Sequence, residues 1–249
     1  MKSNRKYDYA PDLPDFRDYA YADHGARAAV VPRQIDLRHG CSAIKDQGQL
    51  GSCTGNSLAG ATEFELRRAG RNPSDLSRLF IYYAERAIEH TTRSDSGAQI
   101  RDGIKALATV GVCAESVWPY DIAKFRRKPA KADYTAALAN KISKYIRLST
   151  KDDMLNCLAS GFPFVFGFSV YASFEGADVA KTGVVPMPGK SEKLLGGHAV
   201  YAVGYDLDTD RVLVANSWGP GWGQGGFFTI PFAYLTDTNL AEDFWCVQA

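Results

Sequence analysis

The hydrophobic pattern of the chain changes character near its middle, and this change constrains the fold more than any other feature. Before residue 111, apolar residues recur at helical spacing between helix start and stop signals, which predicts helices over about 52–69, 77–89 and 100–110. After a short helix predicted at 152–159, β-prone apolar runs follow at 162–170, 199–205, 211–215 and 227–230. Segregated helices and strands predict an α+β chain with a helical N-terminal lobe and an antiparallel sheet lobe.

Composition and charge exclude several classes of protein. The chain has 249 residues and a formal net charge of +1, which gives no electrostatic case for binding nucleic acid or an anionic membrane. No apolar run approaches the roughly 20 residues that span a bilayer. The N-terminus carries basic residues but no apolar stretch after them, so no signal peptide is visible. The compartment stays open between cytoplasmic and non-classically exported.

The cysteines argue for free thiols. There are five, at positions 41, 53, 113, 157 and 246, and an odd number in a chain of this size is not a disulfide framework. No CxxC pair is present and the four histidines are scattered, so neither a structural zinc site nor any other metal site is expected. No organic cofactor is implied either.

Residues 46–53, with the sequence Asp-Gln-Gly-Gln-Leu-Gly-Ser-Cys, form the first segment that carries chemistry. Cys53 is predicted at the N-terminus of a helix capped by Ser52, where the helix dipole and unpaired amides lower a thiol pKa. Gln47 is a side-chain donor six residues earlier, and with the Cys53 amide it could form an oxyanion hole. The alternative is a buried free cysteine in a glycine-rich loop.

Two further segments complete a catalytic set. His198 follows two glycines at the head of a predicted strand, and Asn216 precedes Ser217 and Trp218 in a glycine-rich loop. An asparagine amide can orient an imidazole ring, and a neighbouring tryptophan can shield their hydrogen bond from water. Taken alone, each segment could be structural. Together with Cys53, they form a nucleophile, a base and an orienting group.

At these residues the chain resembles the papain-like cysteine peptidases, including the bacterial branch of that family. The resemblance runs from about Pro32 to the C-terminus and is strongest at GSC, GGHAVYAVGYD and NSWGPGWGQGGFF. It implies a two-lobe papain-like fold with the active-site cleft between the lobes. Residues 34–249 would form the catalytic domain, with the helical lobe at about 34–130 and the β lobe at about 131–249.

The resemblance also implies a role for each matched residue. Cys53 would be the nucleophile, His198 the base and acid, Asn216 the orienting residue and Gln47 the oxyanion-hole donor. The substrate would be a peptide or protein, cleaved through a thioester acyl-enzyme. No nucleic-acid or membrane partner is implied, and a monomer is favoured. The alternatives are a thiol acyltransferase or deamidase with the same triad, and a catalytically silent papain-fold binding module.

Four residues are expected to contact the substrate on the same basis. Gly97 lies in the glycine-containing stretch that pairs with the substrate backbone in this family. Gly197 and Ala199 match positions that line the pocket for the residue preceding the scissile one. Trp218 would flank the leaving-group side of the cleft. Three departures from the family pattern are Leu50 in place of a cysteine, Thr54 in place of a tryptophan, and Gly197 in place of an aspartate.

Residues 1–33 are rich in tyrosine and proline and show neither helical nor strand periodicity. They are expected to form an extended arm that packs on the body and partly occludes the cleft. If so, deleting residues 1–30 should raise turnover of a small peptide. The alternative is a purely structural arm.

Overall fold

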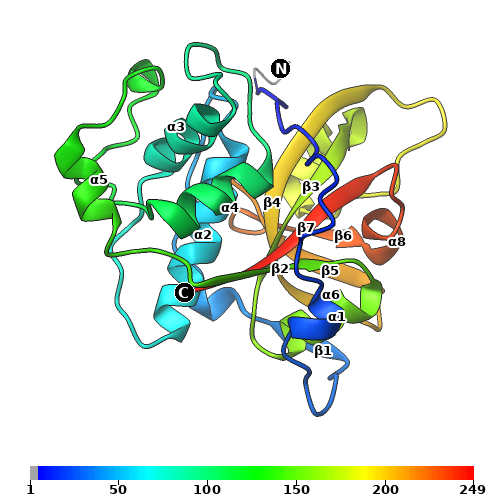
Figure 1. Ribbon diagram of the computed structural model, residues 1–249. Helices are drawn as coiled ribbons and strands as arrows, with labels where there is room; N and C mark the ends of the chain where they lie inside the picture. Colours follow the sequence, from blue (N-terminus) through cyan, green and yellow to red (C-terminus); the bar gives the residue numbers. More distant parts are fainter. Residues whose placement is uncertain (1–4) are drawn as a thin grey trace.

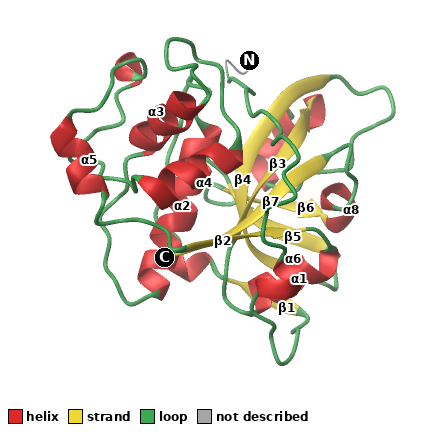
Figure 2. Cartoon of the chain, viewed as in Figure 1, coloured by secondary structure: helices red, strands yellow, loops and turns green. Residues whose placement is uncertain are grey.

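The computed structural model describes residues 5–249 and has a helical half beside a half built on one sheet (Figure 1, Figure 2). The α+β class predicted from the sequence is therefore confirmed. The helices are α1 (Tyr21–His24), α2 (Cys53–Arg68), α3 (Arg78–Ile88), α4 (Ile100–Thr109), α5 (Lys131–Ala137), α6 (Lys151–Ala159), α7 (Ala177–Thr182) and α8 (Phe232–Leu235), with short 3-10 turns at η1 (Arg38–Gly40), η2 (Ile122–Lys124) and η3 (Ala172–Glu175).

The strands of the described chain pair antiparallel throughout, in the order β2-β7-β3-β4-β5-β6, with β1 against β4. They are β1 (Gln34–Asp36), β2 (Lys144–Leu148), β3 (Phe164–Tyr171), β4 (Leu194–Asp206), β5 (Arg211–Ala215), β6 (Phe227–Pro231) and β7 (Ala241–Gln248). The longest strand, β4, is thus central and carries the predicted histidine in its first half.

The sheet separates two apolar cores, because side chains of a strand point alternately to its two faces. On β3, Phe164, Phe166 and Phe168 pack into a core on the side of α6 and α8, whereas Val165 belongs to the core shared with α2, α3 and α4. Both faces of β3 are therefore buried, which is why its sequence is continuously apolar instead of alternating. The α2–β4 contact joins the two halves.

Two helix starts show how local sequence and tertiary contacts compete. Ser77 caps α3, because its hydroxyl accepts a hydrogen bond from the Phe80 amide at 3.1 Å. Ser52 occupies the N-cap position of α2 as predicted, but its side chain makes no capping bond. Its hydroxyl lies 2.5 Å from the Tyr120 hydroxyl instead. Ser52 therefore connects the start of α2 to a distant loop and leaves the amides of the first turn to other partners.

Two elements pack in the opposite half from the one that the predicted lobe boundary near residue 130 assigns to them. Strand β1 pairs with β4, although it belongs to the segment expected to be helical. Helix α5 packs on the helical half, where Phe80 and Tyr134 meet edge to face at 5.0 Å. Among the described residues, no helix is both long and apolar enough to cross a lipid bilayer.

Candidate active site

Cys53 is the first residue of α2 and is completely buried. Burial raises the pKa of its thiol to about 12, while the backbone amides of Ala199 and Thr54 lower it and the charges of Glu85 and Asp8 raise it. The helix N-terminus was expected to lower the thiol pKa. That expectation is wrong for this state of the protein, because desolvation outweighs the amides.

His198 and Asn216 are directly hydrogen-bonded, with His198 Nε2 and Asn216 Oδ1 at 2.9 Å. The same oxygen accepts a bond from the Ser217 amide at 2.8 Å, which holds the carbonyl side of the Asn216 amide toward the ring. His198 Nδ1 is buried and has no hydrogen-bond partner among the described residues. Burial lowers the pKa of the imidazole to about 4, although the bond to Asn216 raises it. Burial thus disfavours the charged form of both the histidine and the thiol.

Trp218 covers the histidine–asparagine contact. Its ring stacks on the His198 ring at 5.2 Å between centroids with an interplanar angle of 29°. Phe168 and Phe174 approach the same imidazole edge-on at 5.7 and 6.4 Å. This aromatic surround excludes water from the His198–Asn216 hydrogen bond, which strengthens its electrostatic component.

Gln47 is completely buried and joins the loop before α2 to the loop after β5. Its Oε1 accepts a hydrogen bond from the Ser217 hydroxyl at 2.5 Å, and its backbone amide donates to the Ser217 carbonyl at 2.9 Å. Its side-chain nitrogen donates to the Leu50 carbonyl at 3.0 Å. An amide nitrogen has two hydrogens, so one donor of Gln47 is left over in a fixed position.

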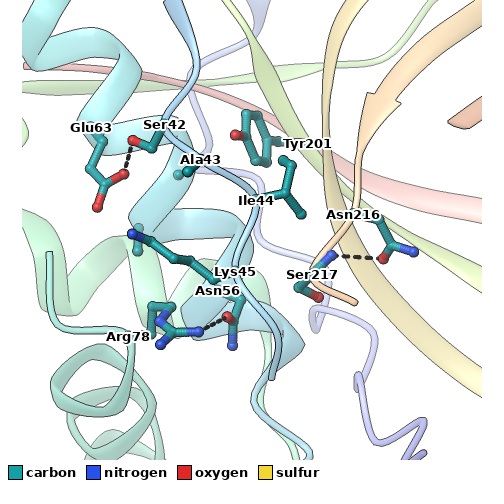
Figure 3. A pocket seen from close by; sticks show the side chains of 12 residues that line it. Ser42, Ala43, Ile44, Lys45, Asn56, Glu63, Arg78, Tyr201, Asn216 and Ser217 are labelled. Carbon is teal, nitrogen blue, oxygen red and sulfur yellow. Dashed lines mark hydrogen bonds between the residues drawn. The ribbon is translucent and has the colours of Figure 1, made fainter. Parts of the chain in front are cut away.

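A small cavity lies behind Asn216 (Figure 3). Its volume is about 20 Å³, and its lining includes Asn216, Ser217, Arg78 and Asn56. Arg78 donates to the Asn56 side chain at 3.1 Å across the lower wall, whereas the Asn216 amide nitrogen has no hydrogen-bond partner within residues 5–249.

The N-terminal arm lies directly on this site. Gly197 donates to the Tyr7 carbonyl at 3.3 Å and accepts from the Tyr9 amide at 3.2 Å, and Ala10 donates to the Ala98 carbonyl at 3.2 Å. The Tyr7 ring lies 6.3 Å from His198. In Figure 1 the arm descends across the junction of the helical and sheet halves.

Each residue expected to contact substrate is near the arm. Gly97, in the left-handed conformation at φ 67°, has no room for a Cβ because the Asp8 carbonyl occupies that space. Gly197 pairs with the arm through both backbone groups. The Trp218 ring lies 6.0 Å from Tyr7. Ala199 is buried in the same apolar cluster as Tyr9.

Asp8 places a carboxyl group against Gly51, two residues before the nucleophile candidate. One of its oxygens is buried without a hydrogen-bond partner among the described residues. Burial and the nearby Asp95 raise the pKa of Asp8, whereas Lys6 lowers it. Because its charge in turn raises the pKa of the Cys53 thiol, the docked arm disfavours the thiolate.

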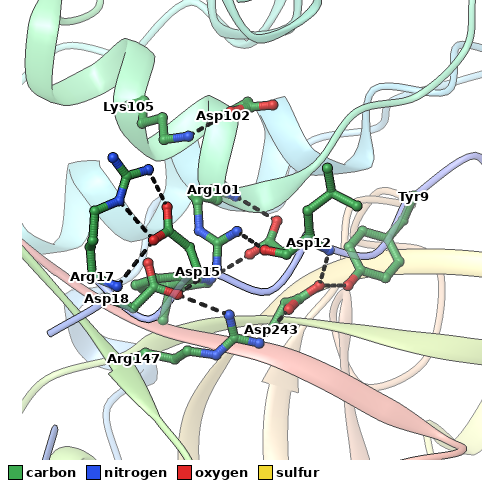
Figure 4. Close-up of polar contacts among 12 residues, drawn as sticks. Tyr9, Asp12, Asp15, Arg17, Asp18, Arg101, Asp102, Lys105, Arg147 and Asp243 are labelled. Atoms are coloured by element: carbon green, nitrogen blue, oxygen red, sulfur yellow. Dashed lines mark hydrogen bonds and ion pairs between the residues drawn. The ribbon is translucent and has the colours of Figure 1, made fainter. Parts of the chain in front are cut away.

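A second group of contacts holds the arm further along the chain (Figure 4). The Asp18 carboxylate pairs with Arg101 and, at 3.2 Å, with Arg147. Arg147 also pairs with Asp243 at 2.8 Å. Asp12 accepts from the Trp245 indole at 2.8 Å, and burial with the nearby Asp243 raises its pKa to about 6. We call Asp12, Asp18, Arg101, Arg147 and Asp243 the charge latch.

Sequence reasoning missed the charge latch and the partner of Thr54. The Thr54 hydroxyl donates to Glu85 at 2.5 Å, and burial raises the pKa of this glutamate well above its usual value. Thr54, which stands where the family has tryptophan, thus provides a hydrogen bond to a buried carboxyl group on α3. No local pattern marks either feature, because both join segments far apart in the sequence. No group of three or more metal-ligating side chains occurs within residues 5–249.

Known proteins share this architecture. The family model for papain family cysteine proteases matches residues 31–244. A peptidase C1-like protein of Acanthamoeba polyphaga mimivirus is 49% identical over 98% of this chain and 87% of its own length. A cathepsin B-like protein of Giardia intestinalis is 28% identical over 86% of this chain and 74% of its own length.

Solved structures of cysteine proteases have the same fold. Xylellain, a cysteine protease from Xylella fastidiosa, superposes with a TM-score of 0.90 at 40% identity, over 100% of this chain and 98% of xylellain. A Carica candamarcensis cysteine protease in complex with E-64 gives a TM-score of 0.64 over 87% of this chain and 98% of its own, and at 21% identity it shows the shared fold alone. The papain-like fold and the resemblance to a bacterial member are confirmed. The family model covers most of this chain, and the mimivirus relative is 49% identical to it. These two matches show that this chain belongs to the papain family of cysteine proteases and is a cysteine endopeptidase.

Proposed function

We propose that the chain hydrolyses peptide bonds with Cys53 as nucleophile, His198 as general base and acid, Asn216 as the residue that orients the imidazole, and Gln47 as an oxyanion-hole donor. The hydrogen bond between His198 Nε2 and Asn216 Oδ1 carries this proposal. It fixes the ring so that Nδ1 stays available, and Nδ1 has no other partner in the described chain. The fold brings the thiol to the amide of Ala199, the residue next to His198.

The reaction proceeds in two stages. His198 Nδ1 takes the proton of Cys53, and the sulfur attacks the scissile carbonyl carbon. The developing oxyanion is held by the free Gln47 hydrogen and the Cys53 amide. His198 then protonates the leaving amine, which departs and leaves a thioester. Water activated by His198 attacks the thioester, releasing the acid product and the thiol. The reaction needs no metal, organic cofactor, nucleic acid or membrane, and a monomer suffices for it.

The arm, residues 1–33, inhibits the enzyme in this proposal. Its backbone pairs with Gly197, where substrate is expected, and its Asp8 carboxyl disfavours the thiolate. Departure of the arm would return water to Cys53 and His198 and remove one negative charge from the thiol. Both changes favour the thiolate–imidazolium pair. The arm therefore acts by steric exclusion and by electrostatics together.

Alkylation by iodoacetamide tests the role of Cys53. We expect loss of peptide turnover to follow alkylation of Cys53, measured by peptide mass spectrometry, because only a thiolate reacts quickly. Cys41, which is partly exposed, provides the reference thiol in the same sample. If turnover follows alkylation of Cys41 and persists after Cys53 is modified, Cys53 is not the nucleophile. Adding a primary amine to the assay separates hydrolysis from acyl transfer.

A further inference from the structure

A groove of about 590 Å³ lies on the helical half, between α3 and the segment that leads into α5. Its lining consists of two tyrosines, an alanine, a proline and two lysines: Tyr83, Ala87, Lys128, Pro129, Lys131 and Tyr134. In Figure 1 α5 lies at the outer edge of the helical half, far from the arm and the strands. The groove is therefore separate from the cleft, and its volume is typical of sites that bind a ligand.

Both sides of the groove are tied to the core of the helical half. The buried guanidinium of Arg86, on α3, donates to the Phe125 carbonyl at 2.6 Å and so anchors the loop before α5. On the other side, the Tyr134 ring packs edge to face on the buried Phe80 at 5.0 Å. The groove is thus held in shape without a ligand, which lowers the entropy cost of binding.

The rim of the groove carries an unbalanced positive charge. Residues 121–134 contain five lysines or arginines and two aspartates. Asp121 pairs with Lys124 at 3.1 Å, and the Asp133 carboxylate accepts from the Ala130 amide at 2.7 Å. Within residues 5–249 no carboxylate pairs with the other four cations, all of them exposed: Arg126, Arg127, Lys128 and Lys131.

The lining and the rim together define the chemistry of a ligand. Two tyrosine rings and a proline favour an aromatic side chain, because aromatic pairs gain more than the area they bury. The four unpaired cations favour carboxylates around that side chain. A polyanion held through its phosphates or sulfates would contact the cations and leave the apolar lining uncovered. The best match is therefore a peptide segment with an aromatic residue among aspartates or glutamates.

We propose that this groove is a second substrate-binding site, which holds an acidic segment with an aromatic residue while the cleft cleaves another part of the same protein. The inference rests on the proposed function and adds the class of protein substrate. Binding at the groove makes the encounter with the cleft intramolecular, which raises kcat/KM without altering the chemistry at Cys53.

Binding of a fluorescent peptide to the full chain with Cys53→Ala tests the site without turnover. The probe is blocked Glu-Glu-Phe-Glu-Glu, followed by anisotropy at about 50 mM salt. Lys128→Glu with Lys131→Glu should weaken saturable binding at least about tenfold, and serine in place of the phenylalanine at least about fivefold. The matched control is Lys181→Glu with Lys190→Glu, two exposed lysines of the sheet half, which should change the affinity less than about twofold.

Cleavage of a fusion protein tests whether the enzyme uses the site. Two fusions carry the same dipeptidyl-arginine sequence, joined by a flexible linker of about 20 residues to the probe peptide or to its serine version. In the Asp18→Ala background, we expect kcat/KM to be at least about threefold higher for the probe fusion. Lys128→Glu with Lys131→Glu should abolish this difference and leave turnover of the small dipeptidyl-arginine substrate unchanged.

The outcomes distinguish this site from the proposed function. Absence of probe binding to a folded Cys53→Ala chain overturns the site, whereas Cys53-dependent turnover of the small substrate decides the function separately. Equal binding of the phenylalanine and serine probes would indicate a general polyanion site and contradict the proposal. Equal losses in the two lysine pairs would reduce the binding to overall charge. Probe binding with equal cleavage of the two fusions would overturn the role in substrate capture.

Discussion

Replacing Cys53 by alanine is expected to lower kcat/KM for a dipeptidyl-arginine fluorogenic substrate by about ten-thousand-fold or more. Without the sulfur no thioester forms, and removing the nucleophile of such a set costs about as much as removing the whole set. The fold should survive, because only one buried atom is lost at the start of α2. The measurement is an initial rate under reducing conditions, in the Asp18→Ala background if the parent rate is too low to detect.

Cys113→Ala is the matched control for this experiment. Cys113 is also completely buried, in the core of the helical half. Its replacement should leave kcat/KM within about threefold and destabilise the fold by about 1–2 kcal/mol through the small cavity. Comparable losses in both variants would indicate that buried thiols support the structure and that Cys53 has no chemical role.

The helices of the first half could be predicted because their signals are local. The predicted range 77–89 becomes α3, and the range 100–110 becomes α4, each within about two residues at either end. The strand β7 was missed, since Asp243 at positive φ interrupts its alternation and two acidic residues reduce its β propensity. The seven-residue α5 was too short for periodicity to reveal.

The candidate residues could be found from short motifs, but their burial beneath the arm could not. The motif around Cys53 predicts a reactive thiol at a helix start, whereas the structure buries the thiol beneath the arm. That burial depends on backbone pairing between Tyr9 and Gly197, nearly 190 positions apart, which no local pattern encodes. For the same reason the charge latch was not visible in a chain whose net charge is close to zero.

Asp18→Ala in the full chain is expected to raise peptide turnover by about ten- to a hundredfold. Asp18 is 12% exposed and pairs with both Arg101 and Arg147, and bonds between charged groups contribute about 1.5–3 kcal/mol. Losing them weakens docking of the arm and leaves the two arginines without this partner, so the equilibrium shifts toward the open site. The measurement is kcat/KM with a saturating reductant, together with the rate of Cys53 alkylation, which should rise in parallel.

Asp15→Ala is the matched control, and the comparison separates inhibition from structural support. Asp15 lies on the same arm, but its hydrogen bonds go to Arg17, whose side chain is 77% exposed, and not to the body. Its removal should change turnover by less than about twofold, as exposed pairs contribute little. A point substitution is sharper than deletion of residues 1–30, because the deletion also removes Tyr9 and Tyr21 from the two apolar cores. Equal turnover of the two variants, with both folded, would mean that the arm supports the structure without controlling access to Cys53.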